Sequence, residues 1–220
     1  MTDLFPTALL AGLLVGVLAS VLLLSVAHRL IALLQGKSPT PRDRRLDGAQ
    51  ASLICVTSAA SAYCWGLTWQ GAGAILCCAL LLTLARIDAQ TGLLPDLLTL
   101  PLLWAGMLFH LAGGWIPLAS SVGAAALGYG VLWLIFTLYR WRTGRDGMGF
   151  GDFKLSAALG AWLGLQSLAA ALLVASLAGC LVGYVGQRTG RWAPGGPIPF
   201  GPFLVLGGIL ILFFDHATLP

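Results

Sequence analysis

The stretch TALLAGLLVGVLASVLLLSVA, residues 7–27, contains no charged side chain. An α-helix of about 20 apolar residues spans the hydrocarbon core of a bilayer, so this stretch predicts a membrane-spanning helix. Seven further apolar runs, some of them short, predict seven more crossings. The eight predicted spans are residues 7–27, 51–69, 72–87, 97–113, 117–139, 153–165, 167–187 and 199–214.

The composition of the whole chain also indicates a membrane protein. Of its 220 residues, 58% are hydrophobic and 9% are charged, and the mean hydropathy is +0.90. A soluble domain carries about 25% charged residues, so these charges are too few to cover a water-soluble surface. The cations lie in short loops between apolar runs, which does not indicate a nucleic-acid-binding face. We therefore predict an all-α polytopic membrane protein in which residues 1–220 form one domain.

The basic residues predict the orientation of the spans. If the loops alternate between the two sides of the membrane, all twelve Lys and Arg residues fall in one set of loops. Cytoplasmic loops carry the excess of Lys and Arg, so we expect these loops in the cytosol and both termini outside. The twelve residues are Arg29, Lys37, Arg42, Arg44, Arg45, Arg86, Arg140, Arg142, Arg145, Lys154, Arg188 and Arg191.

The cysteines and histidines do not predict a metal site. The five cysteines lie in apolar runs, and no pair has the C-x-x-C spacing of a zinc site or redox motif. The three histidines are far apart along the chain and form no ligand motif. We expect neither a metal ion nor an organic cofactor.

Aspartates lie where two apolar runs meet the basic loops. The run RIDAQTGLLPD, residues 86–96, follows the third predicted span, and DGMGFGDFK, residues 146–154, follows the fifth. Two facing carboxyl groups can share a proton, so that one acts as base on a water and the other as acid on a carbonyl oxygen. Gly149 and Gly151 lack a Cβ, which lets the backbone before Asp152 adopt positive φ angles and approach an extended peptide.

Both runs, together with a third, resemble the type IV prepilin peptidases, a GxGD-type family of membrane aspartyl proteases. The resemblance is carried by DAQTGLLPDLLTLPLLW at residues 88–104, GFGDFKL at 149–155 and IPFGPFL at 198–204, and it covers about residues 75–214. It implies that Asp88 and Asp152 are the catalytic pair. It also implies an endopeptidase of the bacterial inner membrane that removes basic leaders from type IV pilins or pilin-like secretion proteins at the cytosolic face.

The loop after the first predicted span departs from the family pattern. Members of that family carry two C-x-x-C pairs there, associated with N-methylation of the trimmed pilin. Residues 35–50, QGKSPTPRDRRLDGAQ, contain no cysteine, so we expect peptidase activity without methyl transfer. The expected partners are a prepilin or pseudopilin substrate and membrane lipid, with no nucleic acid; the oligomeric state stays open.

Two charged residues near the aspartates have more than one interpretation. Asp96 follows Pro95 and precedes an apolar run, which favours an N-cap of the fourth span over a catalytic role. Lys154 either modulates Asp152 or extends its amine to the cytosolic interface.

The helix dipoles predict how the two aspartates divide their roles. Asp88 lies at the C-terminal end of its span, where the dipole favours the protonated form. Asp152 lies at the start of a span, where the dipole favours the carboxylate. We therefore expect Asp152 to be ionised and Asp88 to be protonated.

Two other functions are compatible with aspartates near apolar spans. A small transporter or channel uses such residues to bind cations or relay protons, although the internal repeats common in transporters are not evident in this sequence. A catalytically silent pilus-assembly factor is the second alternative.

Overall fold

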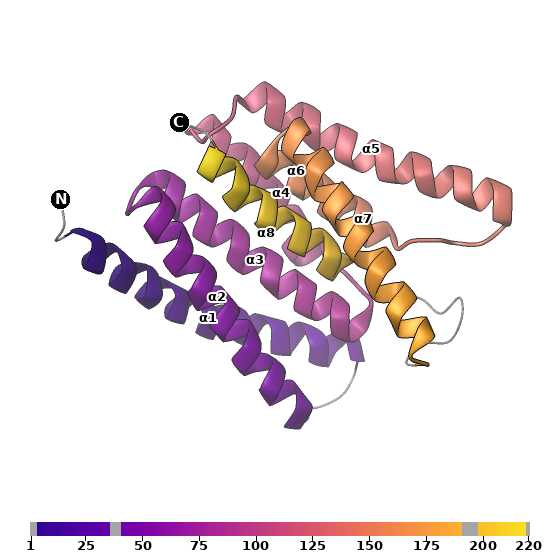
Figure 1. Cartoon of the computed structure of the whole chain (residues 1–220), viewed down its shortest axis with the longest axis horizontal. Coiled ribbons are helices and arrows are strands. Elements are labelled where there is room, and N and C mark those ends of the chain that lie inside the picture. The colour runs from indigo at the N-terminus through magenta and orange to yellow at the C-terminus, as the bar shows by residue number, and fades with distance from the viewer. Residues whose placement is uncertain (1–3, 36–40, 191–197, 219–220) are drawn as a thin grey trace.

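The structure, a computed structural model, describes residues 4–35, 41–190 and 198–218 (Figure 1). Within these residues the chain forms eight α-helices and no strand. The helices are α1 (Leu4–Gln35), α2 (Pro41–Trp65), α3 (Trp69–Thr91), α4 (Asp96–Leu111), α5 (Leu118–Thr143), α6 (Phe150–Leu163), α7 (Leu165–Arg188) and α8 (Gly201–Thr218). Each helix overlaps one predicted apolar run, which confirms the all-α class.

Four of the described helices are long and apolar enough to cross a membrane. They are α3, α5, α7 and the Leu10–Leu34 part of α1. Helices α4 and α8 are apolar but shorter, and α2 opens with a charged turn. The chain is therefore a membrane-embedded helical protein, but four rather than eight helices qualify as spans by length and composition.

Helix α6 has a different place in the bundle from the long helices. Its 14 residues rise about 21 Å, less than the roughly 30 Å of a bilayer core. Nearly all of its side chains from Asp152 to Leu163 are buried, because α4, α5, α7 and α8 pack around it. A helix enclosed by other helices does not have to reach both membrane surfaces.

Contacts between helix ends define the two ends of the bundle. At the first, Asp88 in the last turn of α3 accepts a hydrogen bond from the start of α8 and lies near Asp152 at the start of α6, while Lys154 and Asp96 join the first turns of α6 and α4. We call this the aspartate end. At the second, the tryptophan end, Trp65 packs on Trp115, and the Trp115 indole donates to the Trp162 carbonyl. Helix α1 begins and α8 ends at the same side of the bundle (Figure 1).

The described cations gather toward the aspartate end. Arg140 and Arg142 lie in the last turn of α5, Arg188 lies in the last turn of α7, and Lys154 lies near the start of α6. Arg86, counted above among the loop cations, is instead buried within α3. Lys37 and Arg191 lie outside the described residues, as do the side chains of Arg42, Arg44 and Arg45.

Small residues bring the helices close together. A Cβ added to Gly160 in α6 would lie 2.4 Å from the Ala124 carbonyl oxygen of α5, and one added to Gly128 in α5 would lie 2.8 Å from the Ser156 carbonyl oxygen of α6. The Ser156 hydroxyl donates to the Gly128 carbonyl over 3.0 Å. Close backbone approach and interhelical hydrogen bonds of this kind hold helices together inside a membrane, where apolar burial between helices gives little net gain.

Candidate active site

Asp88 occupies the last turn of α3. Its carbonyl accepts the N–H of Gly92 over 2.7 Å, and Gly92 ends the helix with φ +66°, a left-handed conformation that favours glycine. The Asp88 side chain is only 5% exposed. A buried carboxyl group needs hydrogen-bond partners, and one comes from another helix.

That partner is the backbone of Gly201, the first residue of α8. Its N–H donates to Asp88 Oδ2 over 3.0 Å. The first N–H groups of a helix have no partner within the helix, so the start of α8 suits a carboxylate. A Cβ on Gly201 would lie 2.6 Å from Asp88 Oδ2. This close contact therefore requires glycine at position 201.

Asp152 lies in the first turn of α6, whose N-cap is Gly149. Its side chain is 6% exposed. The carboxyl group accepts the Gly149 backbone N–H, as the third residue of a helix does in a capping box. Asp152 also lies near enough to Asp88 for the two carboxyl groups to repel each other when both are charged.

The donors around Asp88 overturn one expectation from the helix dipoles. A protonated Asp88 was expected because it ends its own helix. In the structure it also faces the N-terminus of α8 and accepts a backbone hydrogen bond there. Both aspartates thus have one backbone donor and one helix N-terminus, so the dipoles do not assign the shared proton to Asp88.

The two glycines before Asp152 do not use positive φ angles. Gly149 has φ −77° and ψ 145°, and Gly151 lies within α6. The conformational freedom that these glycines allow is therefore not used in the structure. What Gly151 provides is close packing, since a Cβ there would lie 2.7 Å from the Cβ of Leu94. The turn between α3 and α4 thus contacts the start of α6.

Lys154 and Asp96 bind each other. Lys154 Nζ lies 2.7 Å from both carboxylate oxygens of Asp96, which joins the first turns of α6 and α4. Asp96 does not cap its helix: the N-cap residue is Pro95, and Asp96 follows it in the first turn. The N-cap prediction for Asp96 is therefore wrong, and its carboxylate instead neutralises Lys154.

Within the described residues, no three His, Cys, Asp or Glu side chains gather as metal ligands. Two buried carboxyl groups at helix ends are themselves sufficient for one kind of chemistry. They can hold a single proton between them and activate a water against an amide. The fold and this pair define a membrane-embedded candidate hydrolase.

Comparison with known proteins places the chain in a family. The type IV leader peptidase family matches residues 75–184, half of the chain, and the match contains both Asp88 and Asp152. The chain therefore belongs to the type IV leader peptidase family.

Several curated relatives have the name prepilin leader peptidase/N-methyltransferase. The Dickeya chrysanthemi protein is 47% identical over 167 residues, which are 74% of this chain and 59% of that protein. The protein of Burkholderia pseudomallei strain 1026b is 50% identical over 62% of this chain and 44% of its own length. The Neisseria gonorrhoeae protein is 45% identical over 71% of this chain and 54% of its own length. The chain thus spans about half the length of these relatives. No solved structure matches it.

No local sequence pattern predicts the Gly201 contact. IPFGPFL carries a resemblance to the family, but the contact joins residues 113 positions apart. Pro202, which has no N–H, does mark the start of a helix and so hints at free backbone donors there. The partner of Arg86 was also missed, because a pairing between α2 and α3 has no local pattern.

Proposed function

We propose that this chain is a membrane aspartyl endopeptidase that removes the basic leader from type IV pilin or pilin-like secretion precursors. Asp88 and Asp152 are its catalytic pair. The observation that carries the proposal is the pair itself: two carboxyl groups from α3 and α6, both nearly inaccessible and within electrostatic reach of each other. Membership of the leader peptidase family supports the substrate class.

The reaction needs one proton shared between the two aspartates. The ionised aspartate takes a proton from a water while the water oxygen attacks the scissile carbonyl carbon. The protonated aspartate gives its proton to the carbonyl oxygen, which forms a neutral gem-diol. The aspartate that was protonated at the start takes a proton back from the diol. The aspartate that was ionised at the start, which now carries the proton from the water, gives it to the amide nitrogen, and the C–N bond breaks. The leader leaves with a new carboxyl group, the pilin with a new amino group, and the pair regains its starting state.

Four residues support the pair in this proposal. The Gly149 N–H and the close packing of Gly151 on Leu94 orient the first turn of α6. The ion pair of Lys154 with Asp96 fixes α6 against α4. We therefore assign Lys154 and Asp96 a positioning role rather than a catalytic one, because the two charges neutralise each other in this ion pair.

We further propose that the chain is one domain that crosses the bacterial inner membrane eight times, with both termini outside and the active site facing the cytosol. The gathering of described cations toward the aspartate end supports this orientation through the positive-inside rule. The shorter helices would cross with the help of their neighbours and of local bilayer thinning. A prepilin and lipid are then the partners.

The cysteine-free stretch 35–50 supports peptidase activity without methyl transfer. Purified protein supplied with a cleaved pilin and a labelled methyl donor is expected to leave the pilin unlabelled. Robust labelling of the new amino terminus would overturn this part of the proposal.

Co-expression with a pilin-like precursor tests the peptidase. Asp88→Asn and Asp152→Asn are each expected to abolish the mobility shift that follows leader removal. Asp146→Asn is the matched control, because Asp146 is exposed and pairs only loosely with Arg140 over 3.3 Å. Normal cleavage by either Asp88→Asn or Asp152→Asn, or loss of cleavage by the control alone, contradicts the assignment of Asp88 and Asp152 as the catalytic pair. A transporter would show no cleavage in any form.

A further inference from the structure

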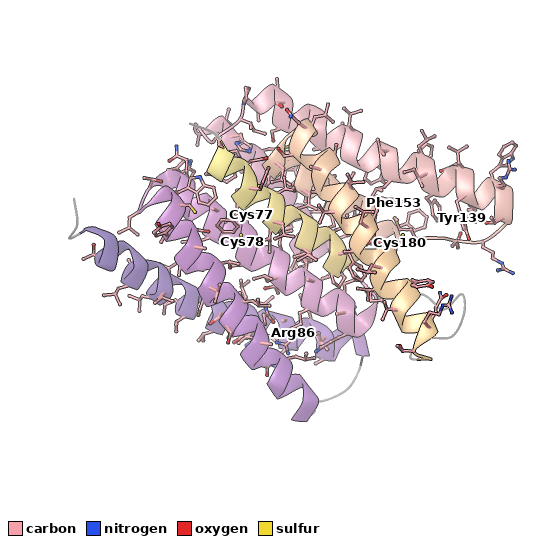
Figure 2. All side chains as sticks on the ribbon, viewed as in Figure 1. Cys77, Cys78, Arg86, Tyr139, Phe153 and Cys180 are labelled. Atoms are coloured by element: carbon pink, nitrogen blue, oxygen red, sulfur yellow. The ribbon has the colours of Figure 1, made fainter. Side chains whose placement is uncertain are left out.

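A cluster of buried polar side chains lies beside the active site and takes no part in the proposed chemistry. It joins α2 and α3 near the aspartate end, where Figure 2 labels Arg86. Arg86 is 7% exposed, Gln50 is 4% exposed and Thr83 is fully buried. Charged and amide groups in an apolar helical bundle are costly and mark a function.

The cluster is closely connected. Arg86 forms an ion pair with Asp47 through Nη2, and its Nη1 donates to Gln50 Oε1 over 2.9 Å. Gln50 Nε2 donates to Thr83 Oγ1 over 3.1 Å. Asp47 also lies 3.0 Å from His28 Nε2 of α1. Three helices are thereby joined around the last two turns of α3.

The position of Arg86 in α3 relates the cluster to Asp88. Residues two apart on a helix of 3.6 residues per turn point about 200° apart. Arg86 therefore faces α2, while Asp88 on the same turn faces α8 and α6. The two side chains thus point to different neighbours, but any shift of this turn moves both of them.

Stability alone does not explain the cluster. Replacing a buried ion pair with apolar residues of similar size is often neutral or stabilising, whereas a network with fixed hydrogen-bond geometry specifies one arrangement. The last turn of α3 is also the place where the helix ends at Gly92. The hydrogen bond of Asp88 with Gly201 ties this turn to α8, and the hydrogen bond of Arg86 with Gln50 ties it to α2.

We propose that Arg86, Asp47 and Gln50 form a positioning cluster that holds the last turn of α3 against α2 and so sets the Asp88 carboxyl group in register with Asp152. This rests on the proposed peptidase function. The prediction specific to the cluster is that loss of its charges slows the chemical step without weakening substrate binding or unfolding the protein.

The double variant Asp47→Leu/Arg86→Met tests this prediction in the full-length protein purified in detergent. We expect kcat for a prepilin to fall about tenfold or more, because small misplacements of catalytic groups have effects of this size. KM should change less than about twofold, and Tm should not fall. The single variant Arg86→Lys keeps the positive charge but not the forked guanidinium geometry, so its kcat should lie between those of the double variant and the wild type. The control Arg140→Met/Asp146→Asn, an exposed ion pair, should match the wild type.

Hydrogen exchange of peptides covering residues 84–94 gives a readout independent of activity. The double variant should exchange faster there than the wild type, with unchanged exchange in α7. A folded double variant with wild-type kcat, or with unchanged exchange at 84–94, overturns the positioning role. If the double variant does not fold, Gln50→Leu gives the same two measurements with the ion pair intact. A wild type that cleaves no prepilin overturns the proposed function, and the exchange result still decides whether the cluster holds this turn.

Discussion

Position 201 has no room for a side chain. The N–H of Gly201 and its missing Cβ both serve Asp88, since a hydrogen bond of 3.0 Å and a Cβ approach of 2.6 Å involve the same carboxylate oxygen. Any side chain at this position must move either α8 or Asp88. The contact therefore predicts a loss of activity without a large loss of stability.

Gly201→Ala should lower kcat roughly tenfold to a hundredfold, because a shift of about 1 Å in a catalytic group has that cost. Its Tm in detergent should stay near that of the wild type, since position 201 is the first residue of α8. Gly123→Ala is the control, because no neighbour lies within 4 Å of a Cβ there. Equal kcat for both variants would show that Gly201 does not position Asp88.

The Lys154–Asp96 pair is half-exposed, which limits its contribution to stability. Exposed ion pairs contribute about 0.2–1 kcal/mol. Lys154→Met should therefore lower the free energy of unfolding by less than about 1 kcal/mol. It should lower kcat a few-fold through the loosened start of α6. Lys154→Arg should retain most of both. A loss as complete as that of Asp152→Asn would make Lys154 a catalytic residue.

At the scale of the helices, α5 and α6 pack with close backbone contact. Gly128 and Gly160 allow backbone contact, while the hydroxyls of Ser121 and Ser156 bond carbonyls of the opposite helix over 2.6 and 3.0 Å. Helix α6 is short and buried, so it depends on these contacts for its position. The position of Asp152 thus depends on contacts one and two turns further along α6, at Ser156 and Gly160.

Gly160→Ala should destabilise the protein by about 1–3 kcal/mol, the usual cost of overpacking. The new methyl group would meet the Ala124 carbonyl oxygen, which cannot move without its helix. Gly130→Ala, with open space around its Cβ, should be neutral or stabilising because alanine favours the helix. Thermal unfolding in detergent measures both. Equal Tm values would show that α5 and α6 do not pack as closely as described.

At the scale of the whole molecule, the sequence predicts the helices better than the contacts between them. Apolar runs have a local signal, so each predicted run overlaps a helix. The role of Gly151 against Leu94, the contact of Gly201 with Asp88, and the pairing of Arg86 with Asp47 are long-range and have none. The dipole of α3 alone also predicted the protonation of Asp88 incorrectly, because the N-terminus of α8, which donates to Asp88, comes from a distant part of the chain.

The orientation of the molecule is testable with single cysteines. Ala119→Cys lies at the start of α5 near the tryptophan end, and Thr143→Cys lies at its other end; both positions are exposed. A membrane-impermeant maleimide added to intact spheroplasts should label Ala119→Cys, and should label Thr143→Cys only after permeabilisation. The unsubstituted protein controls for Cys180, which is also exposed. The reverse labelling pattern would place the aspartate end outside the cytosol.

The central claim is that Asp88 and Asp152 act as one hydrolytic unit, and a double-mutant cycle tests it most directly. Residues that act as a unit have strongly non-additive effects on kcat. Purified wild type, Asp88→Asn, Asp152→Asn and the double variant should be compared on one prepilin under single-turnover conditions. Each single variant should lose about as much activity as the double variant. Independent, additive losses, or measurable turnover by either single variant near the wild-type rate, would contradict the claim.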